Sequence, residues 1–266
     1  MTIKNNKNIH MKIALFSDVH ANLPALESFF ESIEAQKPDA IYCLGDLVGY
    51  NIWSNEVINA IRKKGIPTIA GNHDEMIGQL TDQQAYKIFD FNNIGEISLG
   101  FTNNKVEDQE RAYLKTLPRH IRLEFQFNSE KINILFVHGS PRKINEYLYE
   151  NHNENDFIKL FQEFHTDVLC FGHTHKPYHK VLKEQDNEGR FLYKHAINVG
   201  SVGKPKDGNP QGCYVLLHID ENTVNLDKNS IKVEFIRFDY DVEKAAKAIE
   251  NSPLPNEFAQ MLRNGG

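Results

Sequence analysis

The sequence lacks any long run of apolar residues. Its hydrophobic content is 40% and its charged content 25%, and no stretch approaches the roughly 20 consecutive apolar residues that a helix needs to cross a bilayer. The first ten residues are rich in Asn and Lys and lack the apolar centre and cleavage site of a secretory signal. These absences argue against a membrane partner and favour a cytoplasmic protein with a disordered leader over residues 1–10.

Cysteine is scarce. The three cysteines, Cys43, Cys170 and Cys213, have no metal-ligand spacing, and an odd number leaves one unpaired in any disulfide scheme. Each lies in an apolar run, where buried and reduced thiols of a cytosolic protein are typical. The sequence therefore favours structural thiols over a redox site.

Positive charge is also in short supply. Lys and Arg total 30 against 36 Asp and Glu, the formal net charge is −6, and the basic residues are scattered. Binding of extended nucleic acid depends on a basic surface that neutralises phosphates. Extended nucleic acid is therefore not a favoured partner, whereas a small nucleotide is still compatible with the composition.

The first part of the chain alternates short apolar runs with amphipathic helical segments. The runs at 12–16, 40–44 and 66–70 are predicted strands, and the segments at 23–36 and 55–64 are predicted helices. Strands and helices that alternate over short connections are typical of a parallel sheet covered by helices.

After residue 80 the pattern changes. Two helices are predicted within 82–117, where they form a cap-like insertion, with Tyr86 and Phe89 on an apolar face of the first. The remaining predicted elements are strands at 120–127, 132–137, 168–171, 178–182, 191–198, 212–219 and 231–238 and helices at 157–164, 242–249 and 258–262. Because no repeat or low-complexity linker divides the chain, we expect one domain over 11–266, an α/β sandwich with two central sheets.

Short polar motifs follow several of the apolar runs. In chain order they are Asp18-Val19-His20, Gly45-Asp46, Gly71-Asn72-His73-Asp74, His138-Gly139 and Gly172-His173-Thr174-His175. The carboxyl ends of parallel strands meet in one crevice of an α/β sheet, so these motifs are expected to converge. Each motif alone is common by chance, and its histidines or glycines are then ordinary structural residues. Their joint occurrence indicates a metal site.

The donor atoms of these motifs indicate the kind of metal. Imidazole and carboxylate suit borderline ions such as Mn, Fe, Co, Ni or Zn, whereas Ca and Mg sites are dominated by oxygen. In Asp18-x-His20 and His173-x-His175, residues two apart point the same way if the chain is extended, so both members of each pair are expected to face one site.

The order D-x-H, G-D, G-N-H-D, H-G and G-H-T-H resembles that of the calcineurin-like metallophosphoesterase superfamily. The resemblance covers about Met11 to Tyr240. The stretches GDLVGYN, VHGSPR followed by NEYL, FGHTHKP and NVGSVGKPKDG resemble, more narrowly, the bacterial and archaeal group of small phosphodiesterases of the YfcE type. The resemblance implies a four-layer α/β/β/α sandwich of two mixed sheets flanked by helices, and a hydrolase that acts on phosphate esters.

The same resemblance implies two divalent transition-metal ions. Mn is the preferred identity, with Fe, Zn, Ni or Co as alternatives. The implied ligands are Asp18, His20 and His175 for the first ion, Asn72, His138 and His173 for the second, and Asp46 as the bridge. In the family a hydroxide shared by the metals attacks phosphorus, and two ions roughly 3.5 to 4 Å apart lower the pKa of such a water.

His73 is implied as the catalytic residue that protonates the leaving oxygen or stabilises the transition state. Because it is not an implied metal ligand, it is expected to act as a general acid with a pKa near the working pH. Many relatives carry G-D-x-x-D-R, in which the second Asp orients this histidine and the Arg contacts phosphate, but both are missing from Gly45-Asp46-Leu47-Val48-Gly49-Tyr50-Asn51. Asp74 is a candidate for the orienting partner.

Candidate substrate contacts lie elsewhere in the chain. Arg142 is the preferred phosphate contact, because a planar guanidinium suits bidentate binding of phosphate, although a surface Arg is the alternative. Tyr50 is a second candidate substrate contact. Further candidates to line the pocket are Tyr147, Asn198 and Ser201.

The favoured function is a phosphodiesterase that hydrolyses a small diester or nucleotide-like substrate, because the missing Asp and Arg are features of phosphoprotein monoesterases. The alternatives are a phosphomonoesterase, a dinucleoside polyphosphate hydrolase or, in another class, a non-catalytic scaffold with the same fold. The filled ligand positions argue against the scaffold. The residues from Tyr214 to Leu217 fit either the core or a sheet edge used in a homodimer.

Overall fold

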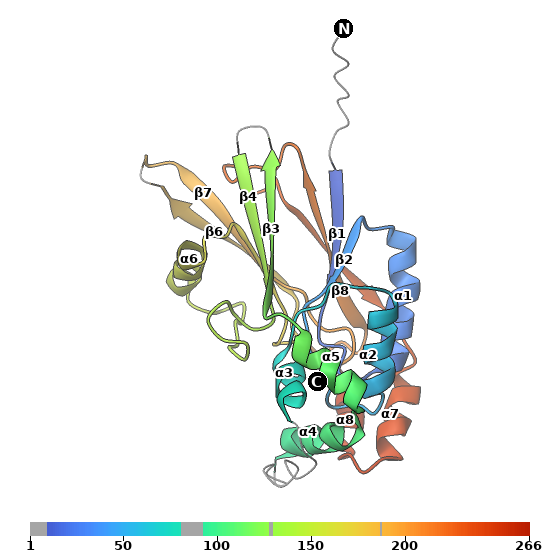
Figure 1. Cartoon of the computed structure of the whole chain (residues 1–266). Helices are drawn as coiled ribbons and strands as arrows, with labels where there is room; N and C mark the ends of the chain where they lie inside the picture. The colour runs from blue at the N-terminus through green and yellow to red at the C-terminus, as the bar shows by residue number, and fades with distance from the viewer. Residues whose placement is uncertain (1–9, 81–92, 128–129, 187) are drawn as a thin grey trace.

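The structure, a computed structural model, describes residues 10–80, 93–127, 130–186 and 188–266. Two mixed β-sheets form its centre (Figure 1). The four-stranded sheet has the order β2 (Ala40–Cys43), β1 (His10–Phe16), β8 (Gly212–Asp220) and β9 (Lys232–Phe238). The five-stranded sheet has the order β3 (His120–Phe127), β4 (Glu130–Val137), β5 (Val168–Phe171), β7 (Phe191–Asn198) and β6 (Tyr178–Gln185).

Helices cover the outer face of each sheet. The helices are α1 (Leu23–Gln36), α2 (Ser54–Lys63), α3 (Asn72–Gln79), α4 (Ile94–Lys105), α5 (Asp108–Thr116), α6 (Glu154–Glu163), α7 (Val242–Glu250) and α8 (Glu257–Asn264). In Figure 1, α1 and α2 lie beside the four-stranded sheet and α6 lies beside the five-stranded sheet. None of the helices in the described part of the chain is both long and apolar enough to span a membrane.

Strand β1 shows why the layers form. Ile13 and Leu15 pack into the core between the two sheets, whereas Ala14 and Phe16 pack on the helical side, where the rings of Phe16 and Phe29 lie 4.3 Å apart. Successive side chains of a strand point to opposite faces, so a strand covered on both faces is apolar throughout. The predicted four-layer sandwich of two mixed sheets is confirmed.

Parallel pairing brings several strand ends to one edge of the molecule. β1 pairs with β2 in parallel, and β5 pairs in parallel with both β4 and β7. The chain leaves β1, β2, β4 and β5 directly into the polar motifs that follow them. The two sheets therefore present their motif loops to a common region between them.

Several sequence predictions differ from the structure. The predicted strand 66–70 is reduced to an isolated bridge between Thr68 and Cys43, since Pro67 has no N–H to donate to a ladder. Helix α3, which begins one residue after Gly71, was not predicted. The segment from Tyr214 to Leu217 lies in β8 between β1 and β9, so it is core rather than a sheet edge.

Other predictions fall partly outside the described residues. The predicted leader lies outside them except for His10, which is ordered as the first residue of β1 and pairs with Asp220. Tyr86 and Phe89 of the predicted insertion also lie outside them, while α4 and α5 supply its two helices. The three cysteines are free and buried.

Candidate metal centre

The first group of predicted ligands converges between the sheets. Asp18, His20 and His175 are at most 2% exposed. Asp18 Oδ1 lies 3.1 Å from Nε2 of His175 and 3.6 Å from Nε2 of His20, and the two Nε2 atoms lie 3.1 Å apart. One carboxylate oxygen and two imidazole nitrogens therefore surround one small volume.

The second group lies beside the first and shares Asp46 with it. Asp46 Oδ2 is 3.2 Å from Nε2 of His138 and 3.5 Å from Nε2 of His20. Asn72 Oδ1 lies 3.2 Å from the same nitrogen of His138, and His173 offers a further ligand atom within the group. Asp46 thus touches both groups, as a bridging ligand must.

The imidazoles are held by hydrogen bonds from their other nitrogen. In three rings Nδ1 lies against a backbone carbonyl oxygen: that of Val48 for His20 (2.9 Å), of Leu44 for His138 (2.8 Å) and of Lys204 for His175 (2.5 Å). A carbonyl only accepts, so each Nδ1 carries the hydrogen and donates it. In a neutral ring this leaves a lone pair on Nε2, the atom that faces the carboxylates, in the arrangement that orients histidine ligands of metals.

The converging atoms fit a cation. With Nδ1 donating to carbonyls, the Nε2 lone pairs of His20 and His175 face each other and also face Asp18 Oδ1, at 3.6 and 3.1 Å respectively. Within the described residues, Asp18 Oδ1 and His173 Nε2 are buried with no hydrogen-bond partner. Buried acceptors without donors are costly unless a positive charge lies between them, and the mixed nitrogen and oxygen set suits a transition metal.

The backbone at these ligands differs from the prediction. The expectation that Asp18-x-His20 and His173-x-His175 lie in extended chain is wrong, because the ligands adopt left-handed conformations. The residues concerned are Asp18 (φ 56°), His20 (φ 48°), Asp46 (φ 55°), His173 (φ 63°) and His175 (φ 60°). Asp and His enter this region more readily than most residues, but each instance costs about 1 kcal/mol or more. The fold holds this strain where the ligands converge.

The carboxylates and imidazoles of the site shift one another's pKa values. Burial alone would raise the pKa of Asp18 and of Asp46, but His175 and His138 respectively hold each carboxylate well below its ordinary value. Burial alone would lower the pKa of His138, but the adjacent Asp46 raises it to about 9. A proton on His138 competes with a metal for the same nitrogen, so metal binding there displaces it.

His73 lies beside the ligands without a polar partner for its ring. Its backbone N–H donates to Asp46 Oδ1 (2.9 Å), and its ring lies 5.0 Å from the rings of both His20 and Tyr50. Nδ1 is buried with no hydrogen-bond partner among the described residues, and a Cβ on Gly49 would come within 2.6 Å of it. Packing against two rings and a glycine therefore orients His73, and no carboxylate of the described residues accepts a hydrogen bond from Nδ1.

Two expectations about His73 are corrected. Burial lowers its pKa to about 3, rather than leaving it near the working pH, so the ring is neutral at pH 7. Asp74 does not orient it, because Oδ1 accepts from the N–H of Leu47 and Oδ2 from the N–H of Gly71, which caps α3.

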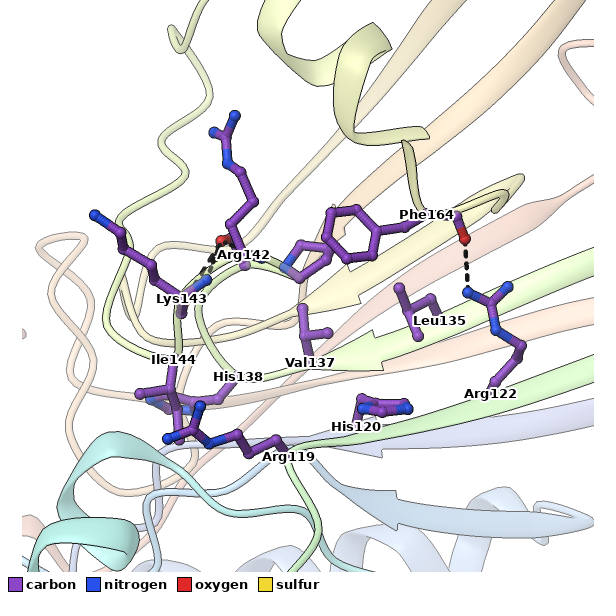
Figure 2. A pocket seen from close by; sticks show the side chains of 12 residues that line it. Arg119, His120, Arg122, Leu135, Val137, His138, Arg142, Lys143, Ile144 and Phe164 are labelled. Atoms are coloured by element: carbon purple, nitrogen blue, oxygen red, sulfur yellow. Dashed lines mark hydrogen bonds between the residues drawn. The ribbon is translucent and has the colours of Figure 1, made fainter. Parts of the chain in front are cut away.

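The structure pairs Arg142 with carboxylates. Its guanidinium donates to Asp156 (2.7 and 2.9 Å) and to Glu146 (2.8 Å), which leaves it little capacity to contact phosphate. Figure 2 shows its side chain turned away from His138, at the rim of a cavity of about 210 Å³ that both residues line. Arg142 as described is part of an ion-pair cluster, which corrects its predicted role.

The other candidate pocket residues divide into two groups. Tyr50 and Tyr147 lie against the ligands, with ring centroids 4.7 Å from His20 and 4.2 Å from His173 respectively. Asn198 instead braces the loop before His173, because its Nδ2 donates to the carbonyl of Gly172 (2.7 Å). Ser201 likewise donates to the carbonyl of Asp18 (2.8 Å), so these two residues support the ligand loops from behind.

Sequence reasoning missed two lysines beside the ligands. Burial lowers the pKa of Lys204 to about 7, and the positive charge of the neighbouring Lys206 contributes to this shift. Burial also lowers the pKa of Lys206, while the carboxylates of Asp18 and Asp46 act in the opposite direction. Both lie in the stretch GKPKDG, whose Lys-Pro-Lys sequence was the available signal.

Comparisons with known proteins assign the class. The family model for the calcineurin-like phosphoesterase superfamily domain matches residues 11–222, so the chain belongs to this superfamily of metallophosphoesterases. An uncharacterized protein of Methanocaldococcus jannaschii is 30% identical over 260 residues, which cover 94% of this chain and 96% of that protein.

Solved structures agree on the fold. A metallophosphoesterase from Sphaerobacter thermophilus is 26% identical with a TM-score of 0.69, covering 97% of this chain and all of its own. A hypothetical protein from Pyrococcus horikoshii is 23% identical with a TM-score of 0.75, covering 96% of this chain and 98% of its own. YfcE of E. coli is also structurally similar, but at 20% identity and a TM-score of 0.41 it carries no statement about substrate.

Proposed function

We propose that this phosphoesterase is a phosphodiesterase that hydrolyses a small, nucleotide-like diester with two divalent transition-metal ions, Mn by preference. The observation that carries the proposal is the convergence of buried imidazole nitrogens and carboxylate oxygens, of which Asp18 Oδ1 and His173 Nε2 have no hydrogen-bond partner among the described residues. Asp18, His20 and His175 would hold one ion, Asn72, His138 and His173 the other, and Asp46 both. The buried, free thiols of the protein suit a reducing cytoplasm.

The metals and the protein have separate tasks. When bound, two divalent ions supply Lewis acidity toward phosphate oxygens and lower the pKa of a water. The protein orients the imidazoles through carbonyls and excludes solvent around the ligand cluster, which strengthens every charge interaction within it. His73, neutral at pH 7, donates one ring N–H toward the developing charge on the phosphate or the leaving oxygen.

The preference for a diester rests on the Asp and Arg of the G-D-x-x-D-R pattern that this chain lacks. A monoester dianion needs more positive charge than a diester monoanion, and relatives that act on phosphoproteins supply it with an Arg that is missing here. Arg142 does not replace it, since two carboxylates occupy its guanidinium. The proposed function is tested by comparing a chromogenic diester, the corresponding monoester and a dinucleoside polyphosphate, each with added Mn.

Removal of metal is expected to abolish hydrolysis of the diester. Chelator treatment leaves the facing acceptors of Asp18, His20 and His175 uncompensated, so it should also lower the melting temperature, and Mn should restore both properties. Steady-state assays and thermal melts before and after chelation measure the two effects. Full activity in excess chelator, with metal content confirmed to be zero, would contradict the proposal.

His73→Ala is expected to lower kcat by about 10² to 10⁴-fold while metal content stays close to that of the wild type. The ring donates in the transition state but is not assigned to a metal, although it lies near Asp46 and His20, with which it forms a group of potential ligands. Metal analysis beside kinetics separates the two roles. A variant that loses metal in proportion to activity would make His73 a ligand.

A further inference from the structure

A hollow of about 490 Å³ opens beside the ligand cluster and is lined by lysines and tyrosines. The ring of Tyr50 lines the hollow on the side of the ligands. Its centroid lies 4.7 Å from the centroid of the His20 ring. Thr174, which lies between the ligands His173 and His175, also lines it. The hollow therefore adjoins the ligand cluster and is separated from it by one side chain.

Two lysines in this hollow have no carboxylate partner. Lys204 is 3% exposed, and among the described residues its Nζ lies 3.4 Å from Met261 Sδ and 4.7 Å from the centroid of the Tyr50 ring. Lys206 Nζ lies 5.9 Å from the centroid of the same ring. Within the described ranges neither lysine forms an ion pair, whereas Arg263 at the surface pairs with both Glu243 and Glu250.

The placement of these two lysines, one buried and one half-buried, indicates a missing anion. A buried charge is costly unless an opposite charge or several hydrogen bonds compensate it, and a thioether and an aromatic face are weak compensation. A phosphate group offers charge and strong acceptors to both lysines. Lys176 lines the same hollow and also lacks an ion pair among the described residues, so three lysines surround one hollow.

Two tyrosines provide flat apolar surface at the other side of the hollow. Tyr147 and Tyr149 are 48% and 42% exposed, unusual values for large rings, and their planes lie within 9° of each other. Tyr147 is fixed by stacking on His173, at 4.2 Å and 19°. Rigid aromatic surfaces beside basic residues are typical of sites that stack a nucleobase next to its phosphates.

We propose, on the basis of the phosphodiesterase function above, that this hollow is a second anion subsite of the enzyme. Lys204 and Lys206 contact a further phosphate group of the substrate, and Tyr147 and Tyr149 contact its base. The substrate class is therefore a nucleotide with at least two linked phosphates. In its hydrolysis the oxygen of a water bonds to one phosphorus, the bond between that phosphorus and the bridging oxygen breaks, and the two phosphates separate as monoesters with release of the protons of the water.

The kinetic test compares a dinucleoside diphosphate with bis(p-nitrophenyl) phosphate in the Mn-loaded enzyme. Lys206→Gln and Lys204→Met should each lower the ratio of kcat/KM for the dinucleotide to kcat/KM for the aryl diester by at least tenfold. Lys131→Gln is the matched control, because Lys131 is exposed and paired with Glu124 at a distance from the hollow, and its ratio should equal that of the wild type. An unchanged ratio in both hollow variants would overturn the proposal.

A binding test examines the subsite in protein from which the metals have been removed. Calorimetry on the chelator-treated protein should show ADP binding more tightly than adenosine, and Lys206→Gln should raise the Kd of ADP at least tenfold but leave that of adenosine within threefold. Equal binding of ADP by wild type and variant would overturn the subsite. If Lys204→Met fails to fold in thermal melts, Lys206→Gln, whose side chain is less buried, carries the test.

The two proposals fail in distinguishable ways. If the metal-loaded enzyme hydrolyses neither substrate, the phosphodiesterase proposal fails, and the subsite is then judged by the binding of ADP alone. If the aryl diester is hydrolysed and the selectivity ratio does not depend on the lysines, the subsite fails and the phosphodiesterase proposal stands.

Discussion

Asp46→Asn is expected to lower kcat/KM for a phosphodiester on the order of 10³-fold or more. Asp46 Oδ2 faces Nε2 of His20 at 3.5 Å and Nε2 of His138 at 3.2 Å, so it is the side chain common to both proposed metal positions. An amide NH₂ at this place donates to those nitrogens, occupies their lone pairs and removes the charge that attracts the ions. Metal analysis and diester kinetics measure the loss.

The fold should survive this substitution. Asn keeps an oxygen at the Oδ1 position, which accepts from the backbone N–H of His73 (2.9 Å), and its amide satisfies acceptors that face one another in the metal-free protein. The chelated Asp46→Asn variant should therefore still unfold cooperatively, with a thermal melt lowered only by the loss of the ion pair between Asp46 and His138. Asp227→Asn, an exposed substitution in a surface turn, is the control. Undiminished activity and metal content in Asp46→Asn would refute the bridging role.

Gly71→Ala is expected to damage stability and metal binding together. A Cβ on Gly71 would lie 2.1 Å from Asp46 Oδ1 and 2.2 Å from Asp46 N, distances that real Cβ atoms do not adopt. Because part of the obstruction is backbone, the loop after β2 must move, and with it the bridging carboxylate. The expected cost is about 3 kcal/mol in the free energy of unfolding, with a loss of bound metal.

Chemical denaturation and metal analysis test this substitution, with Gly65→Ala as the matched control. Gly65 follows helix α2 and has φ 64°, and a Cβ there meets nothing within 4 Å. Its cost should be limited to backbone strain of about 1 kcal/mol, with metal retained. Equal effects of the two substitutions would show that the close approach of Gly71 to Asp46 does not matter.

The prediction of the site from sequence had a sound basis and an incorrect detail. The loops that follow the strands do bring the predicted ligands together, because parallel strands present these loops at one edge of the sheet. The ligands on them are Asp18, Asp46, His138, His173 and His175. The geometry of each D-x-H and H-x-H pair, however, depends on left-handed backbone. The alternation of side chains along an extended strand does not predict such a conformation. Hydrogen bonds such as that from Asp18 N to the carbonyl of Gly45 (2.9 Å) hold this conformation, and they join segments far apart in the chain.

Charged residues were the least predictable part. The guanidinium of Arg142 is chemically suited to bind phosphate, but in the structure it donates hydrogen bonds to Asp156 of α6. Lys204 was overlooked because a lysine in a turn is ordinarily exposed, and only the packing of Tyr50 and Met261 buries it. The pKa of His73 could not be anticipated either, since it is lowered by burial that the sequence does not reveal.

The sequence alone determined the layered fold, the family and the donor atoms of the proposed metal centre, because these follow from hydrophobic periodicity and from polar residues placed at strand ends. Only the tertiary structure decided which groups are buried without a partner, which carboxylates already hold an arginine and which side chains surround His73. Those properties depend on contacts between residues remote in sequence, and electrostatic energies at a site are set by such contacts and by exclusion of water.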